Sequence, residues 1–184
     1  MAEVQAKNWV VKMIINRKWA MPNSNTFSIP PISELVTRYT AQGGKNQVIV
    51  DPFANGCGIG TITNDLNPKF NTTYHLDALD FLKMLDDESA DIVLYDPPYS
   101  LRQVKECYEG VGITVTSEHT KSSWRAKHLD EIKRILKPDG LCLCFGWNTN
   151  GVGKTRGFEM IEILVVAHGG SKNDTLCTVE RKLR

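Results

Sequence analysis

The alternation of apolar and polar positions along the chain predicts short strands separated by amphipathic helices. Runs rich in apolar and β-branched residues, typical of strands in a buried sheet, predict strands over 47–51, 61–65, 72–77, 90–96 and 141–147. Apolar residues at helical spacing predict helices over 32–41, 78–85, 102–109 and 122–137. This order is typical of an α/β domain.

Both ends of the chain add to this pattern. Strands over 160–167 and 175–181, joined by a short glycine-containing link, predict an antiparallel hairpin at the C-terminal end. The expected fold is therefore a mainly parallel sheet of about seven strands, closed by that hairpin. The apolar run within residues 1–20 fits a strand and a helix equally well. Residues 26–31 are expected to be extended, because a residue before proline avoids the helical region.

The connection after the first of these strands is unusually short. Only about ten residues separate Asp51 from Thr61, whereas a parallel crossover takes roughly a dozen or more. The usual crossover helix is therefore expected to be replaced by a glycine-rich loop. Its Gly-x-Gly-x-Gly pattern, Gly56 to Gly60, differs from the dinucleotide Gly-x-Gly-x-x-Gly, so NAD binding is not indicated.

Composition narrows the class of protein. With 184 residues, 41% hydrophobic and 23% charged, the chain has the balance of one globular domain. A net charge of +1 means that nucleic-acid binding would rest on a local basic patch. The five cysteines lack metal-ligand spacing and are expected to be reduced thiols of a cytoplasmic protein. No apolar run is long enough to span a membrane, and no signal peptide is recognised.

Acidic residues follow successive predicted strands. Each of four strands ends in an acid, namely Asp51, Asp65, Asp77 and Asp96. The carboxyl ends of parallel strands share one edge of the sheet, where ligands bind in open α/β folds, so these carboxylates should gather there. One or two such residues could be helix caps, but four beside a glycine loop and the turn at Pro97-Pro98 favour a site.

These residues resemble a known family, the S-adenosylmethionine-dependent adenine-specific (N6) DNA methyltransferases. The match is closest to the small phage and prophage type without a separate target-recognition domain. Asp96-Pro97-Pro98-Tyr99 looks like the family's catalytic signature, Asp51-Pro52-Phe53-Ala54 and its glycines like the cofactor loop, and Thr26-Phe27 like the N-terminal cofactor motif. The implied catalytic residues are Asp96, Pro97, Pro98 and Tyr99; the implied cofactor-binding residues are Thr26, Phe27, Asp51, Pro52, Phe53, Asp65, Asp77 and Ala78.

The resemblance implies transfer of a methyl group from S-adenosylmethionine to the exocyclic amino group of adenine in DNA. The Asp96 carboxylate and the Pro97 carbonyl would accept hydrogen bonds from that amino group, and Tyr99 would stack on the extruded base. Asp65 and Asp77 fall where the family holds the ribose hydroxyls and the adenine amino group of the cofactor. No metal is implied. The whole of 1–184 is expected to be one methyltransferase domain: an N-terminal arm (1–45), a cofactor and catalytic half (46–100) and a second half with the hairpin (101–184).

Two departures from the family limit what is implied. The missing crossover helix changes how the cofactor's methionine part would be held, and no segment is long enough for a target-recognition domain. Target choice would come from the loop 111–125, from a partner subunit or from a homodimer. Six basic residues could contact phosphates near the site: Lys105, Lys121, Arg125, Lys127, Lys154 and Arg156. Trp147 and Asn148 are candidates for the base pocket, with core packing as the alternative for Trp147.

Other functions stay open. Asp-Pro-Pro-aromatic motifs also serve guanine amino groups in ribosomal RNA, so an RNA base methyltransferase is the main alternative. Methylation of the cytosine amino group ranks lower, because that chemistry more often carries Ser in place of Asp96. The alternative that is not an enzyme is a cofactor-binding subunit of a larger modification complex. The expected location is the cytoplasm of a bacterial or phage-infected cell.

Overall fold

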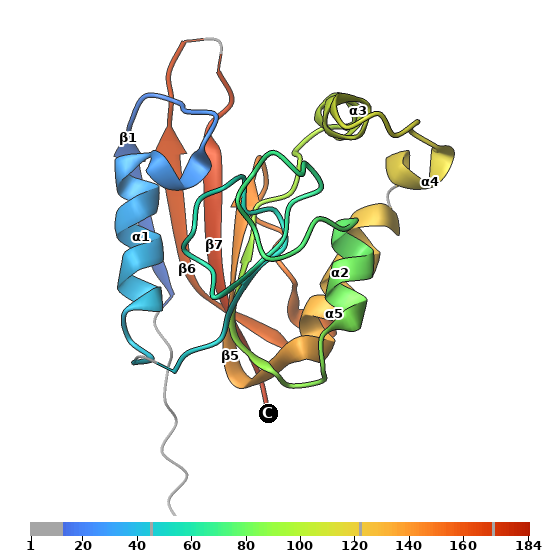
Figure 1. Ribbon diagram of the computed structural model, residues 1–184. Helices are drawn as coiled ribbons and strands as arrows, with labels where there is room; N and C mark the ends of the chain where they lie inside the picture. The colour runs from blue at the N-terminus through green and yellow to red at the C-terminus, as the bar shows by residue number, and fades with distance from the viewer. Residues whose placement is uncertain (1–12, 45, 122, 171) are drawn as a thin grey trace, which may run out of the picture.

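One seven-stranded sheet forms the centre of the molecule (Figure 1). The computed structural model describes residues 13–44, 46–121, 123–170 and 172–184. The strand order is β1-β6-β7-β5-β4-β2-β3. The strands are β1 (Ile14–Trp19), β2 (Ile49–Asp51), β3 (Ile62–Thr63), β4 (Ala90–Tyr95), β5 (Leu136–Gly146), β6 (Phe158–Ala167) and β7 (Thr175–Lys182).

The direction of the strands matches the predicted topology. Strand β7 runs antiparallel to its neighbours β5 and β6, and the other pairs, from β1–β6 to β2–β3, are parallel. The mainly parallel sheet of about seven strands with a C-terminal antiparallel hairpin is therefore confirmed. Residues 1–20 fitted a strand and a helix equally well, and the structure has a strand over Ile14–Trp19. Residues 1–12 lie outside the described part of the chain.

Helices cover both faces of the sheet (Figure 1). They are η1 (Thr26–Ser28), α1 (Pro30–Thr40), α2 (Ala78–Met84), α3 (Leu101–Gly110), α4 (Ser117–Thr120), α5 (Ser123–Ile135) and η2 (Lys154–Arg156). In β4, Ile92 and Leu94 pack in the core beneath α1, whereas Val93 and Tyr95 pack beneath α2 and α5. This alternation makes β4 apolar on both faces, as a central parallel strand requires.

Two predicted extended segments are wrong. Residues 26–28 form the short helix η1, and α1 begins at Pro30, because prolines at the first helical positions need no N–H partner. Only Ile29, directly before the prolines, is extended. The strand predicted over 72–77 is reduced to a single bridge between Asn64 and Tyr74.

The connections on either side of β3 explain this loss. As predicted, a loop replaces the crossover helix between β2 and β3. The buried side chain of Asn64 ties the loops together: its amide donates to the carbonyls of Pro52 (3.1 Å) and Leu76 (3.0 Å) and accepts from the Leu76 N–H (2.9 Å). These bonds occupy backbone groups that a further strand would otherwise pair.

The sheet places the predicted catalytic stretch at its carboxyl edge. Strand β4 ends at Tyr95, and Asp96 with the two prolines follows directly. Among the described residues, no helix is both long enough and apolar enough to cross a bilayer.

Candidate active site

A cavity of about 520 Å³ lies at this edge of the sheet. Five of the predicted cofactor residues line it together with the whole predicted catalytic stretch: Thr26, Pro52, Phe53, Asp65, Ala78, Asp96, Pro97, Pro98 and Tyr99. Segments from five parts of the chain therefore meet where the parallel strands end. We call this space the acidic cavity, because acidic side chains line it.

The charges of the acidic cavity all have one sign. Asp65, Asp96 and Glu106 line it, and in the described chain no lysine, arginine or histidine does. Opposite charges are attracted strongly in a partly enclosed site, since solvent screening is weaker there than in bulk water. The cavity therefore suits a cationic ligand and disfavours one that carries phosphate groups.

Asp96 is held by two hydroxyl groups. The Tyr99 hydroxyl donates to Asp96 Oδ1, and Thr26 also hydrogen-bonds the Asp96 side chain. Burial raises the pKa of Asp96 to about 6, although both hydrogen bonds act to lower it. Tyr99 is fixed in turn, because its backbone N–H donates to Gln103 Oε1 at 2.7 Å. The site thus holds a carboxyl group whose pKa lies close to neutrality.

Asp51, the predicted cofactor residue at the end of β2, is fully buried and does not line the cavity. Its Oδ1 accepts from the Phe53 N–H at 3.1 Å, while its Oδ2 has no partner. Burial raises the pKa of Asp51 well above its ordinary value, and the nearby charges of Asp96 and Asp65 raise it further. The surroundings of Asp51 therefore favour the uncharged form of its carboxyl group.

The glycine-rich loop after Asp51 holds both open and packed glycines, and none of Gly56, Gly58 and Gly60 lines the acidic cavity. Gly58 has a φ of +67°, which favours glycine, and a Cβ atom built there would meet nothing within 4 Å. Gly60 is packed instead, because a Cβ atom would lie 3.0 Å from the Asp51 Cβ. The loop therefore keeps a bare backbone facing open space and a tight turn against the acid.

Asp65 and Asp77, the two remaining acids of the predicted set, accept hydrogen bonds from groups of the protein. Asp65 accepts from the backbone N–H groups of Asn55 (2.9 Å) and Asn67 (2.8 Å). Asp77 caps α2 by accepting from the Leu79 N–H (2.9 Å), and its other oxygen accepts from the Tyr108 hydroxyl. Asp65 lines the cavity, whereas Asp77 is not part of its wall.

Phe27 is another predicted cofactor residue that does not line the cavity. It is buried in the core and contacts Phe145 edge to face, with ring centroids 4.9 Å apart. The sequence analysis missed Tyr108, which lines the cavity from α3. No motif marks this tyrosine, and its bond to Asp77 joins residues 31 positions apart.

A second cavity of about 370 Å³ lies against the same turn. Pro97, Pro98 and Tyr99 contribute to both cavities, so this turn forms a shared wall. The second space is lined by the aromatic side chains of Trp124, Phe145 and Trp147 and by the basic side chains of Lys121 and Arg125. No aspartate or glutamate of the described chain lines it, and we call it the basic cavity.

Trp147 and Asn148 lie in the basic cavity, as proposed for a base pocket. The Trp147 side chain is 41% exposed and contacts Tyr99 with ring centroids 5.8 Å apart, so core packing does not account for it. Arg125 lies with its guanidinium carbon 5.7 Å from the Tyr95 ring centroid and donates to Asn148 Oδ1 at 3.5 Å. Its charge is thereby held beside the aromatic residues.

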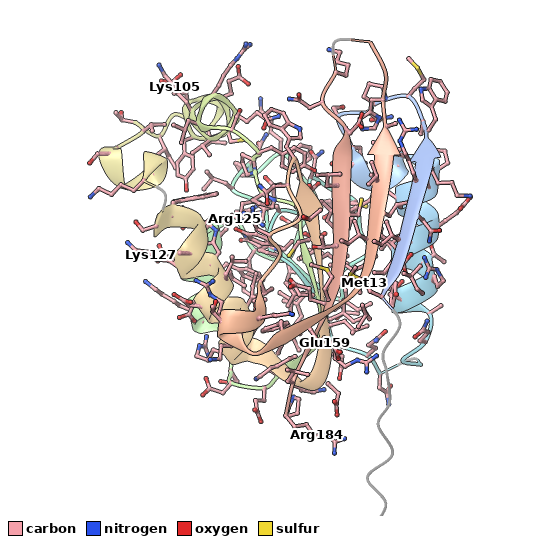
Figure 2. All side chains as sticks on the ribbon, turned by 180° about the vertical axis from the view of Figure 1, so that it is seen from behind. Met13, Lys105, Arg125, Lys127, Glu159 and Arg184 are labelled. Atoms are coloured by element: carbon pink, nitrogen blue, oxygen red, sulfur yellow. The ribbon has the colours of Figure 1, made fainter. Side chains whose placement is uncertain are left out.

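The other basic candidates differ in position. Lys105 on α3 forms an ion pair with Glu109 (3.6 Å), and Lys127 lies on the outer side of α5, whereas Arg125 lies toward the sheet (Figure 2). Lys154 and Arg156 belong to η2, which leads into the first residue of β6 at the opposite edge of the sheet. The prediction that these two lie near the site is therefore wrong. Arg156 pairs there with Asp130 at 2.7 Å.

Comparisons with known proteins agree on the fold. The chain resembles the crystal structure of TrmN from Thermus thermophilus, with a TM-score of 0.56 and 18% identity, over 84% of this chain and 49% of that one. It also resembles 1,6-didemethyltoxoflavin-N1-methyltransferase from Burkholderia thailandensis, crystallised with S-adenosylhomocysteine, with a TM-score of 0.55 and 13% identity, over 84% of this chain and 77% of that one. The chain therefore has the Rossmann-like methyltransferase fold.

Similarity in sequence is more limited. The chain is 35% identical over 95 residues to the type II methyltransferase M.BamHI of Bacillus amyloliquefaciens. This match covers 46% of the chain and 21% of that protein, so the chain spans only about a fifth of the relative's length. No family model matches the chain.

Proposed function

We propose that this protein transfers a methyl group from S-adenosylmethionine to the exocyclic amino group of adenine in DNA. The observation that carries the proposal is the pair of oppositely charged cavities that share the wall Pro97-Pro98-Tyr99, with Asp96 at the wall's base. The acidic cavity would hold the cofactor, and the basic cavity would hold the target nucleotide. The sequence similarity to a type II methyltransferase supports methyl transfer.

The charge of the acidic cavity supports this cofactor. S-adenosylmethionine carries a positive sulfonium and an ammonium group and no phosphate, and when bound it supplies an electrophilic methyl group. Asp96 and Asp65 would attract these charges. Thr26, Pro52, Phe53 and Ala78 would form the walls around it.

The shared wall supports transfer to an amino group. The lone pair of an aromatic amine is delocalised, and acceptors that bind its hydrogens localise it and aim it. Asp96 and the Pro97 carbonyl are such acceptors, held rigidly by the two prolines. The Tyr99 hydroxyl now occupies Asp96 Oδ1. Stacking of Tyr99 on a base would release that oxygen for the amino group.

Asp96 is also suited to take up the proton that leaves. When the new C–N bond forms and the C–S bond breaks, the nitrogen becomes cationic and must lose one hydrogen. A carboxylate whose pKa is about 6 can accept this proton near neutral pH and return it to solvent. Asp96 would therefore orient the amino group before transfer and act as base after it.

The basic cavity supports a nucleotide as substrate. Trp147 and Tyr99 offer aromatic surfaces to a base that has been extruded from the duplex, and Lys121 and Arg125 offer positive charge to the adjacent phosphates. The choice of DNA and of adenine rests on the resemblance of Asp96-Pro97-Pro98-Tyr99 to the adenine-specific enzymes. Target sequence would be selected by loop 111–125, by a second copy or by a partner subunit.

The proposal is tested by identifying the methylated nucleoside. The purified protein is incubated with S-adenosylmethionine labelled in the methyl group and with either DNA or RNA, which is then digested. We expect label in N6-methyl-2′-deoxyadenosine from DNA, and far less of it with the Asp96→Ala variant. Label in methylguanosine from RNA would replace the substrate assignment, and cofactor binding without any transfer would favour a non-catalytic subunit.

A further inference from the structure

The wall Pro97-Pro98-Tyr99 between the two cavities carries a single backbone N–H group. The two prolines have none, so Tyr99 supplies it. This group donates to Gln103 Oε1 at 2.7 Å, which is at the short end of the usual range for such a hydrogen bond. The backbone donor of the wall is therefore anchored by one side chain, whereas β4, which ends at Tyr95, is paired on both sides with β2 and β5.

Gln103 is held in place by the first turn of α3. Ser100 caps this helix, and its Oγ accepts from the Gln103 N–H at 3.3 Å. The Ser100 carbonyl accepts from the Val104 N–H at 3.0 Å, and the Val104 side chain is only 3% exposed. The Gln103 backbone thus lies between a helix cap and a residue packed in the interior, so its side chain meets Tyr99 from a defined position.

The bond from Tyr99 to Gln103 departs from ordinary helix capping. In a capping box, the side chain three residues after the N-cap accepts from the N–H of the N-cap itself. Helix α4 shows this form, because His119 Nδ1 accepts from the N–H of Thr116, its N-cap, at 3.1 Å. In α3 the equivalent side chain, Gln103, accepts from the N–H one residue further back, that of Tyr99. It therefore anchors the wall rather than the end of the helix.

This anchor joins the wall to the helix that closes the acidic cavity. Gln103 lines the acidic cavity together with Glu106 and Tyr108 of the same helix, whereas Tyr99 lines both cavities. A shift of the Tyr99 backbone would move its ring, which contacts Trp147 in the basic cavity. It would also move its hydroxyl, which donates to Asp96 Oδ1. One hydrogen bond therefore fixes groups on both sides of the wall.

We propose that Gln103 is a positioning residue for methyl transfer, which acts through the Tyr99 N–H to hold the wall in place beside the cofactor. The proposal rests on the proposed function and extends it. Alignment of the reacting groups affects the transfer step more than binding, and a displacement of about 1 Å can lower the rate about 100-fold. Loss of this bond should therefore lower kcat and leave the KM for the cofactor nearly unchanged.

The test compares two substitutions of Gln103. Gln103→Met removes the acceptor but keeps a side chain of similar length and helix propensity, whereas Gln103→Glu keeps an acceptor oxygen. Transfer to unmethylated duplex DNA is measured with S-adenosylmethionine labelled in the methyl group. In Gln103→Met, kcat should fall about 10- to 100-fold, while the KM for S-adenosylmethionine changes less than about threefold. Gln103→Glu should keep kcat within about threefold of the wild type, because the Tyr99 N–H still has its partner.

Hydrogen exchange followed by NMR gives a readout that does not depend on activity. The amide hydrogen of Tyr99 should exchange at least about tenfold faster in Gln103→Met than in the wild type, because its acceptor is gone. Glu109→Met provides the matched control, since Glu109 is exposed on the same helix and lines neither cavity. This control should keep both kcat and the slow exchange. If Gln103→Met does not fold, Gln103→Ala serves instead, with the same expected loss.

The outcomes separate the two proposals. An unchanged kcat or an unchanged exchange rate in Gln103→Met would overturn the role of Gln103, as would an equal loss of kcat in Gln103→Met and Gln103→Glu. A rise in KM without a fall in kcat would also overturn it, because Gln103 would then only line the cavity. In these cases the proposed function stands, since the wild type still transfers the methyl group. A wild type that transfers no methyl group to DNA would overturn the proposed function and this inference with it.

Discussion

The two cavities on either side of Pro97-Pro98-Tyr99 lie at the same edge of one sheet, yet their charges are opposite. Three carboxyl groups line the acidic cavity, including Asp65 and Asp96, whereas Lys121 and Arg125 line the basic one. A dinucleotide enzyme would need positive groups or helix N-termini around its cofactor phosphates. The difference instead fits a cationic methyl donor on one side and a phosphate-bearing acceptor on the other, with Asp96 on the acidic side of the shared wall.

The largest effect on the rate of methyl transfer is expected from a substitution of Asp96, which lines the acidic cavity beside the shared wall. Asp96→Ala should lower the rate of methyl transfer by about 10²–10³-fold, because it removes a charged group aimed at the reacting amine. Binding of S-adenosylhomocysteine, which has no sulfonium charge, should change little in the same variant. The two quantities are measured by label transfer and by calorimetry. Equal loss of both would show that Asp96 acts by holding the cofactor cavity together.

The second effect is on pH dependence. Asp96 must be ionised to accept from the amino group, and its pKa is about 6, so the rate should fall about tenfold per pH unit below that value. Thr26→Val removes a hydrogen bond that lowers this pKa, and should therefore shift the acid limb of the profile to higher pH. Thr40→Val, on α1, loses a hydrogen bond to the Val36 carbonyl and should leave the profile in place. An unchanged pH–rate profile in Thr26→Val would show that Thr26 does not affect the pKa of Asp96.

A smaller effect is expected from the aromatic wall of the basic cavity. Trp147→Ala should raise the KM for DNA by about tenfold, because base stacking on an aromatic side chain contributes about 1–3 kcal/mol. Its affinity for S-adenosylhomocysteine should stay at the wild-type level. Trp19→Ala provides the control, since that tryptophan is 66% exposed on β1 and lines neither cavity. A loss of cofactor affinity in Trp147→Ala would contradict the division of labour between the cavities.

The smallest effect is expected on the salt dependence of DNA binding. Lys121→Gln should weaken DNA binding modestly and make the slope of log affinity against log salt concentration shallower by about 0.9, the value for one phosphate contact. The control is Lys18→Gln on exposed strand β1. Fluorescence anisotropy with labelled DNA at several salt concentrations measures both slopes. If Lys121→Gln had the same salt slope as the wild type, Lys121 would not contact a phosphate of the DNA.

Local patterns explain why much of the fold could be predicted. The apolar run of β4 and its stop at Pro97-Pro98 depend on neighbouring residues alone, as does the hairpin of β6 and β7. The gathering of Asp51, Asp65 and Asp96 at one edge then follows from parallel strands. A strand over 72–77 was wrongly predicted from its β-branched residues, because the distant side chain of Asn64 takes the backbone groups of Leu76.

The rest of the site depends on packing between distant segments. Phe27 stands in a motif that resembles a cofactor motif, but its contact with Phe145 on β5 places it in the core. Tyr108 has no recognisable motif, and its place in the cavity wall follows only from the approach of α3 to Asp77 at the start of α2. Neither contact leaves a pattern in the sequence around the residue.

A crystal structure of the protein with S-adenosylhomocysteine tests the central claim most directly. The account predicts the ligand in the acidic cavity, with its sulfur atom beside Asp96, and the basic cavity left open toward Lys121 and Arg125. A ligand seated in the basic cavity, or in the acidic cavity with its adenine at Asp96, would contradict the assignment of the two cavities.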